Sequence, residues 1–177
     1  MPGSATMDAT RLPVPMAEFR LSAERGTRLA TVGLGSCIAV CLFDGERRVA
    51  GMLHAMLPLS QADPAAAKEQ PAMYADTGII QLRQAMLEAG ARGDALEAWL
   101  VGGAQVLAAS EAGPFRVGQR NAAVARVMCA EMGITLAGEA TGGRFARSVE
   151  FDPATKVLVI RTAGEEQTVR WEDHVEE

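Results

Sequence analysis

Short apolar runs separated by glycine-containing breaks follow one another along the first third of the chain. Each run is short enough for a strand and is bounded by breaks, which favours β-structure over helix. The expected strands cover residues 19–21, 29–32, 38–43 and 49–57. The Asp44-Gly45 pair predicts the sharpest turn, because both residues tolerate turn conformations.

Helical spacing of apolar residues begins later. Residues 76–88 predict a helix, with Asp76 as its N-cap and a buried stripe formed by Ile79, Leu82 and Met86. Residues 58–72, rich in proline and alanine, predict the loop that precedes it. A second helix is expected over 121–132, with Asn121 as its cap. Its expected buried residues are Val124, Val127, Met128 and Met132.

The remaining pattern is again strand-like. Strands are expected over residues 96–101, 136–140, 145–151 and 157–161, with a possible final strand over 167–171. Strands outnumber helices and do not alternate with them regularly. The sequence therefore predicts an α+β domain in which mixed sheets pack with a few helices.

The domain organisation is simple. Residues 1–17 lack apolar periodicity and predict a disordered tail, 18–171 a single domain, and 172–177 an acidic tail. A chain of 177 residues with 49% apolar residues can build one sizeable core. The net charge of -5 disfavours nucleic acid as a partner. Without a long apolar stretch or a leader-like start, we expect no membrane insertion and a cytoplasmic protein.

Cysteine usage points to chemistry at one position. Three cysteines are too few for a disulfide framework, so reduced thiols are expected. Cys37 follows a glycine-rich turn, where the backbone N–H groups around Gly35 and Ser36 could bind an oxyanion. Cys41 and Cys129 lie within apolar patterns and are expected to be core residues.

Two alternatives to a catalytic thiol stay open from the residues alone. Cys37, Cys41 and His54 could bind zinc, but strand residues four apart lie roughly 13 Å from each other, whereas thiolates sharing a zinc lie within roughly 4 Å. The residues alone favour His54 as a buried histidine bonded to backbone.

His174, the second histidine, lies in the acidic tail. For Arg147, a sheet-edge charge with a carboxylate partner is favoured over substrate recognition.

Several motifs that follow one another along the chain resemble those of one protein family. The segment TVGLGSCIAVCLFD, followed by GMLHAMLP, resembles the signature of the CheD family of chemoreceptor glutamine deamidases. Further similar stretches are MYADTGI at 73–79, VGGAQV at 101–106, VGQRN at 117–121 and TGGRFARSVEFD at 141–152. Ala50-Gly51, Leu53 and Ala55 depart mildly from the family pattern.

The resemblance implies roles for individual residues. Cys37 would be the nucleophile, His54 the base and Thr31 the residue that orients His54, with the turn at Gly35 and Ser36 beside the oxyanion. It implies a fold of two packed mixed β-sheets flanked by helices, similar to the catalytic domain of cytotoxic necrotizing factor toxin, and chemistry without a cofactor or metal. No substrate-binding residue is assigned.

The resemblance also implies partners. These are the cytoplasmic helices of methyl-accepting chemoreceptors and, in many bacteria, a CheC-type phosphatase; a monomer is expected. Two other functions remain open. A thiol nucleophile could hydrolyse receptor methyl esters with the same residues. Alternatively, the protein could be a non-catalytic interaction module that docks on the phosphatase and the receptor.

Overall fold

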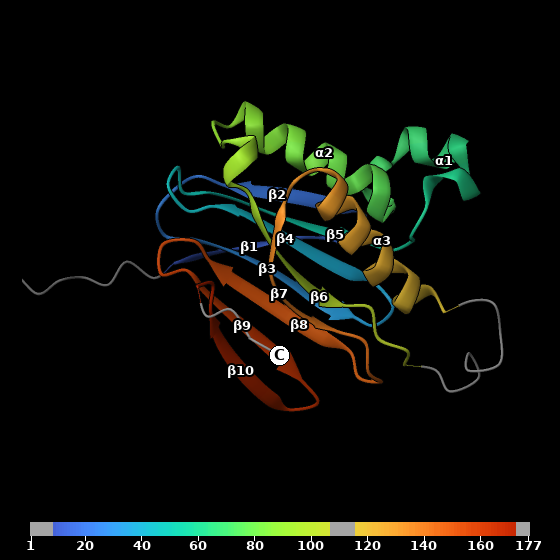
Figure 1. Cartoon of the computed structure of the whole chain (residues 1–177). Coiled ribbons are helices and arrows are strands. Elements are labelled where there is room, and N and C mark those ends of the chain that lie inside the picture. The colour runs from blue at the N-terminus through green and yellow to red at the C-terminus, as the bar shows by residue number, and fades with distance from the viewer. Residues whose placement is uncertain (1–8, 107–115, 173–177) are drawn as a thin grey trace, which may run out of the picture.

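Two five-stranded sheets and three α-helices make up the described part of the computed structural model, residues 9–106 and 116–172 (Figure 1). Sheet 1 contains, in spatial order, β1 (Thr10–Pro13), β3 (Thr27–Leu34), β8 (Arg147–Asp152), β9 (Val157–Thr162) and β10 (Glu165–Arg170). Sheet 2 contains β2 (Glu18–Ser22), β5 (Val49–Ala55), β4 (Ile38–Asp44), β6 (Glu97–Gly102) and β7 (Thr135–Thr141). The helices are α1 (Pro64–Glu69), α2 (Ala75–Glu88) and α3 (Val117–Glu131).

Both sheets are mixed. In sheet 1, β1 pairs in parallel with β3, and the other neighbours are antiparallel. In sheet 2, β6 and β7 are parallel, while β2, β5, β4 and β6 form antiparallel pairs. The architecture confirms the expected α+β class with two packed mixed sheets.

The domain has three layers, which are sheet 1, sheet 2 and the helices, and two apolar cores join them. Between the sheets lies an inter-sheet core that includes Leu29, Phe151, Cys41, Met52 and Trp99. The opposite face of sheet 2 packs against α2 and α3 through a second core that includes Ile38, Leu53, Ile79, Leu82 and Ala125. Figure 1 shows the helices on one side of sheet 2 and sheet 1 on the other. Because sheet 2 is covered on both faces, all seven residues of β4 and of β5 are buried.

All nine expected strands and both expected helices are present, with shifted ends. The expectation of an unstructured tail over 1–17 is wrong for Thr10–Pro13, which forms β1. Its four residues carry no run of apolar alternation, and the strand exists because it pairs with β3. Residues 58–72 are not a plain loop, since Asp63 caps α1 by accepting a hydrogen bond from the Ala66 N–H.

The helix ends also differ from the expected caps. The second helix begins at Val117, four residues before the expected start, so its buried face includes Ala122, Ala125 and Cys129. Val127, expected in the core, is 54% exposed. Asp76 lies inside α2, and its carboxylate accepts hydrogen bonds from the N–H and hydroxyl of Ser60 instead of capping the helix. These bonds fasten the segment after β5 to the helix.

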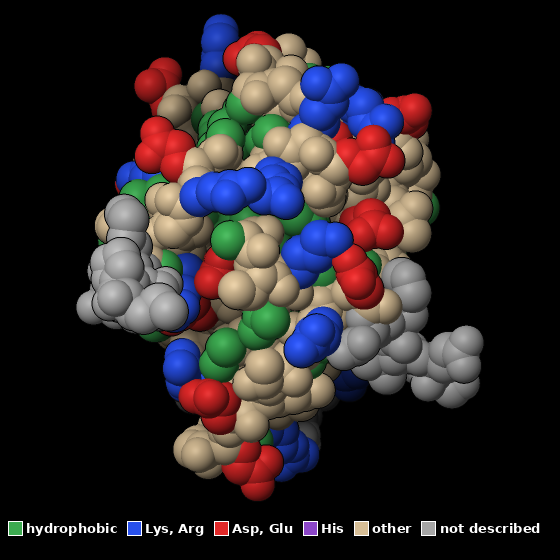
Figure 2. All heavy atoms as spheres, turned by 90° about the vertical axis from the view of Figure 1, so that its left-hand side faces the viewer, with side chains coloured by type: hydrophobic (Ala, Val, Ile, Leu, Met, Phe, Trp, Pro, Cys, Tyr) green, Lys and Arg blue, Asp and Glu red, His purple; other side chains and the backbone are tan. Residues whose placement is uncertain are grey.

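The surface carries mixed charge. Figure 2 shows a face on which basic and acidic side chains are interspersed and apolar side chains form only small patches. No helix in the described residues is long and apolar enough to span a bilayer.

Candidate active site

The side chain of His54 lies between the two sheets, where only 2% of its surface is exposed. It projects from β5 in sheet 2 and meets Thr31 from β3 in sheet 1, with 2.8 Å between Nδ1 of His54 and Oγ1 of Thr31. The imidazole therefore bonds to a side chain of the opposite sheet, and a backbone group, that of Val14, also acts on it.

The Thr31 hydroxyl decides which nitrogen of His54 carries the proton. The same Oγ1 lies 2.8 Å from the carbonyl oxygen of Val14, which can only accept. The single hydroxyl proton therefore goes to Val14, and the neutral imidazole donates its Nδ1–H to Thr31. In this tautomer Nε2 carries the lone pair, and Nε2 is buried without a hydrogen-bond partner among the described residues. An unpaired, basic ring nitrogen is what a general base requires.

Burial keeps His54 neutral. Desolvation lowers the pKa of His54 below its ordinary value, against a smaller opposing effect of the Val14 carbonyl. At neutral pH the imidazole is thus in the form that can accept a proton.

Cys37 lies directly before β4 and packs against the inter-sheet core, the layer into which His54 projects. In the register of β4 and β5, Ala39 is opposite His54, so the two point to the same face. Cys37 precedes Ala39 by two residues and packs against the same inter-sheet core. Continued by one residue, that register makes Cys37 a diagonal neighbour of His54, a relationship that places Cα atoms about 7–8 Å apart.

The three cysteines differ in exposure and acidity. Cys37 is half-buried, whereas Cys41 and Cys129 are buried in the two cores. Burial raises the pKa of Cys41 to about 12 and that of Cys129 to about 11. Desolvation also raises the pKa of Cys37, but its own backbone N–H acts in the opposite direction. Of the three thiols, only that of Cys37 has both access to solvent and a local hydrogen-bond donor.

The turn before Cys37 is held by the segment that follows β6. The N–H of Ala104 donates to the Gly35 carbonyl and that of Gly103 to the Cys37 carbonyl, each over 2.8 Å. Gly102 makes this approach possible: it has a φ of +113°, and a Cβ there would fall against the Cys37 carbonyl oxygen. Close backbone packing at this site therefore depends on a glycine that lies outside the glycine-rich turn itself.

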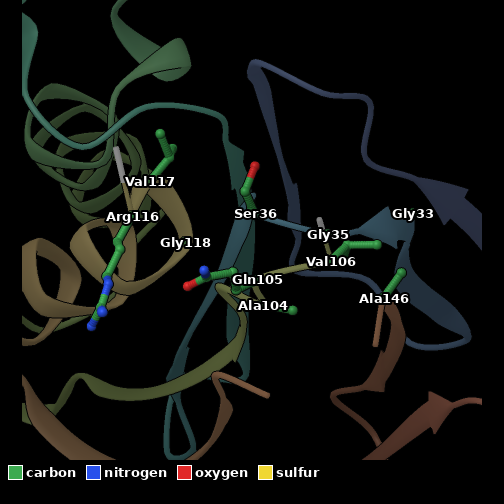
Figure 3. A pocket seen from close by; sticks show the side chains of 10 residues that line it. All are labelled: Gly33, Gly35, Ser36, Ala104, Gln105, Val106, Arg116, Val117, Gly118 and Ala146. Atoms are coloured by element: carbon green, nitrogen blue, oxygen red, sulfur yellow. The ribbon is translucent and has the colours of Figure 1, made fainter. Parts of the chain in front are cut away.

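A cavity of about 410 Å³ opens beside the same turn (Figure 3). Gly33, Gly35 and Ser36 line one side of it, and the segment 104–106 and the first turn of α3 line others. Open space therefore borders the residues that directly precede Cys37.

Comparison with known proteins identifies the family. Residues 56–162 match the model of a family described as "CheD chemotactic sensory transduction". The chain belongs to the CheD family.

The family match begins two residues after His54. Curated CheD relatives extend the similarity over a longer part of the chain. The chain is 38% identical over 151 residues to "Probable chemoreceptor glutamine deamidase CheD 1" of Syntrophus aciditrophicus, covering 85% of this chain and 93% of the relative. It is 41% identical over 138 residues to "Chemoreceptor glutamine deamidase CheD" of Halalkalibacterium halodurans, covering 76% and 83%.

The chain is also similar to solved structures. A Bacillus licheniformis hypothetical protein, YfiH, aligns over 76% of this chain and 60% of its own, with 11% identity and a TM-score of 0.46.

The structure thus brings Thr31 and His54 into contact and places Cys37 at the start of β4, against the inter-sheet core, with Gly35 and Ser36 in the adjoining turn. Arg147 departs from expectation: its guanidinium donates to the carbonyls of Gly142 and Gly102, and it has no carboxylate partner among the residues that the structure describes. His174 lies outside the described residues.

Asn121 is a buried residue near Cys37 whose role the sequence did not reveal. It lies in the interior of α3 and is completely buried, and its amide contacts the turn before Cys37, so it is no cap. Its place in the face of α3 formed by Ala122, Ala125 and Cys129 could have marked it as a buried polar side chain.

Proposed function

We propose that this protein is a protein-glutamine deamidase that converts glutamine side chains on the cytoplasmic helices of methyl-accepting chemoreceptors to glutamate. Membership of the CheD family and the names of its curated relatives support the reaction and the substrate. The observation that carries the mechanism is His54: its Nδ1 is bonded to Thr31, and its Nε2 is unpaired on the face it shares with Cys37.

Acylation comes first in the proposed mechanism. Nε2 of His54 takes the proton of the Cys37 thiol while the sulfur attacks the δ-carbonyl carbon of the glutamine. The resulting tetrahedral intermediate collapses as its C–N bond breaks, and His54 returns the proton to the leaving nitrogen. Ammonia leaves, and a thioester joins Cys37 to the receptor.

Hydrolysis completes the cycle. His54 removes a proton from water, the water oxygen bonds to the thioester carbon, and the C–S bond breaks. The proton returns to the Cys37 sulfur, and glutamate remains on the receptor. Lowering of the His54 pKa suits this role, because a neutral imidazole is available in both half-reactions.

The oxyanion of each tetrahedral intermediate requires hydrogen-bond donors. The backbone N–H groups of Cys37 and Ser36 are proposed to supply them, since they lie at the turn between Gly35 and β4. We propose the cavity beside Gly35 and Ser36 as the path by which the glutamine side chain enters. These roles need no metal or cofactor.

The remaining aspects of the function are proposals on the same basis. The protein is proposed to act in the cytoplasm as a monomer and, where a CheC-type phosphatase is present, to bind it. Sedimentation of the purified chain alone and with such a phosphatase tests both the oligomeric state and the partner.

The test of the reaction distinguishes it from its two rivals. Purified receptor cytoplasmic fragments, unmodified or methyl-esterified, are incubated with the protein, and ammonia and methanol are measured. Ammonia from glutamine-bearing fragments supports deamidation. Methanol without ammonia would instead identify a methylesterase, and binding of receptor or phosphatase without either product would identify an interaction module.

A further inference from the structure

Three consecutive carbonyl groups in the turn before β4 are each held by a donor from elsewhere in the chain. Backbone N–H groups of Ala104 and Gly103 hold the Gly35 and Cys37 carbonyls. The carbonyl between them, that of Ser36, accepts from Nδ2 of Asn121 over 2.8 Å. Of these three donors, the amide of Asn121 is the one that belongs to a side chain, so this donor can be removed by substitution.

The same amide group reaches the strand that carries His54. Nδ2 of Asn121 also donates to the carbonyl of Met56, over 2.9 Å. Met56 follows His54 by two residues, and Ser36 directly precedes Cys37. The two protons of one amide thus join the turn of the thiol to the end of the strand of the imidazole.

The environment of Asn121 is costly for an amide. The residue has no exposed surface, and its Oδ1 has no hydrogen-bond partner among the described residues. A buried unpaired acceptor lowers stability. An apolar residue would avoid that loss, but it would leave both carbonyls without their donor.

The bond to Ser36 acts directly on the peptide that contains the Cys37 N–H. In a trans peptide the C=O and N–H groups point in opposite directions. A donor on the Ser36 carbonyl therefore fixes the direction of the Cys37 N–H and, by polarising the peptide, strengthens it as a donor. That N–H already acts on the thiol, since it lowers the pKa of Cys37 against the effect of burial.

We propose that Asn121 is a positioning residue of the deamidation site, which aims the Cys37 N–H at the thiolate and at the oxyanion while tying the Cys37 turn to the strand of His54. This inference rests on the proposed function for its catalytic consequence. Its structural half, the setting of the Cys37 N–H, concerns the free protein alone.

The test compares Asn121→Ala with Cys129→Ala. Cys129 lies on the same helix, is also buried, and packs in the core between sheet 2 and the helices. Its truncation therefore also leaves a cavity, but it does not affect the contacts of the turn before Cys37. The first readout is the rate of iodoacetamide alkylation of Cys37 against pH, resolved by site with mass spectrometry. The second is the split between kcat and KM in ammonia release.

For Asn121→Ala we expect the midpoint of the alkylation profile to rise by about half a pH unit or more, because the thiolate loses an oriented donor. We also expect kcat to fall about tenfold or more with KM within about twofold, because the donor matters most in the transition state. Cys129→Ala should leave both readouts at wild-type values. An unchanged midpoint and kcat in Asn121→Ala, or equal changes in Cys129→Ala, would overturn the proposal.

Asn121→Ser covers the case in which the alanine variant does not fold. Its hydroxyl can donate one hydrogen bond, so an intermediate midpoint and kcat are expected, and wild-type values would count against the proposal. Failure of the proposed function remains distinguishable. If wild-type protein releases no ammonia from receptors, the deamidase assignment fails, whereas the alkylation profiles still decide whether Asn121 sets the Cys37 N–H.

Discussion

The hydroxyl oxygen of Thr31 lies 2.8 Å from Nδ1 of His54, although the two residues belong to different sheets. Thr31 is in turn fixed by the carbonyl of Val14, the residue that follows β1. The orientation of the imidazole thus depends on the packing of sheet 1 against sheet 2. Any change that separates the sheets at this point should disturb the proposed base before it unfolds the domain.

Replacing Thr31 by valine removes this contact with little change of shape. The buried Nδ1–H of His54 then loses its side-chain acceptor, at a cost of about 1–3 kcal/mol, which corresponds to roughly 5- to 150-fold in rate if it falls on the active tautomer. We expect kcat for ammonia release to fall by that amount with KM unchanged. Steady-state kinetics on a receptor fragment measures both.

Thr31→Ser is the matched control, because it keeps the hydroxyl and loses only a methyl group. It should retain most of the wild-type kcat. Equal rates for Thr31→Val and wild type would show that Thr31 does not orient the base.

The depressed pKa of His54 predicts how stability depends on pH. Burial lowers the pKa of His54 in the folded protein below its ordinary value of 6.5. Between the two values the unfolded chain binds a proton that the folded chain does not, so protonation favours unfolding. The stabilising effect of the neutral imidazole is complete above about pH 6.5 and is lost as pH falls through the folded pKa.

Urea denaturation of wild type and His54→Gln at about pH 7.5, 6.5 and 5.5 measures this effect, since the difference between the proteins isolates His54 from other titrating groups. Wild type should lose more free energy of unfolding than the variant on going to the lowest pH. Parallel pH dependences would mean that His54 is not buried in its neutral form.

Gly102 offers a separate test of the Cys37 turn. Gly102→Ala imposes a φ of +113° on an alanine and presses its Cβ against the Cys37 carbonyl oxygen. Gly90 has a φ of +99°, and a Cβ added there would meet no atom within 4 Å, so it has the backbone strain without the contact. Gly90→Ala should cost about 1–2 kcal/mol of unfolding free energy, and Gly102→Ala about 1–3 kcal/mol more, because backbone atoms must move.

Activity separates the two glycine variants further. Gly102→Ala should also lower ammonia release, because it displaces Cys37, whereas folded Gly90→Ala should work at the wild-type rate. Similar stability and activity in the two variants would show that the segment after β6 does not hold the turn. Denaturation curves and the ammonia assay are sufficient.

Strands of sheet 2 could be predicted because their apolar residues are nearly continuous, as in β4 and β5, which are covered on both faces. By contrast, β1 has only four residues and depends on a parallel partner, β3, which local patterns do not report. In α3 the buried face includes Gly118, Ala122 and Ala125, small residues that contribute little to a hydrophobic stripe. The stripe was therefore assigned to larger residues, among them the exposed Val127.

The residues of the candidate site also differ in how far local sequence features predict them. The glycine-rich turn singled out Cys37, because glycines and a following strand are local features. Thr31 was reached only through the family resemblance, since its contact with His54 crosses between sheets. Asn121 was misjudged because its partners, the carbonyls of Ser36 and Met56, are distant in sequence and carry no side-chain signal.

The central claim is that the Cys37 thiol deamidates receptor glutamine. The most direct measurement is the intact mass of receptor fragments, together with ammonia, after incubation with wild type, Cys37→Ala and Cys41→Ala. Cys41, buried in the inter-sheet core, is the control for loss of a thiol. Wild type and folded Cys41→Ala should each add about one dalton per modified site with one ammonia, and Cys37→Ala should add none. Deamidation by Cys37→Ala at the wild-type rate would contradict the account.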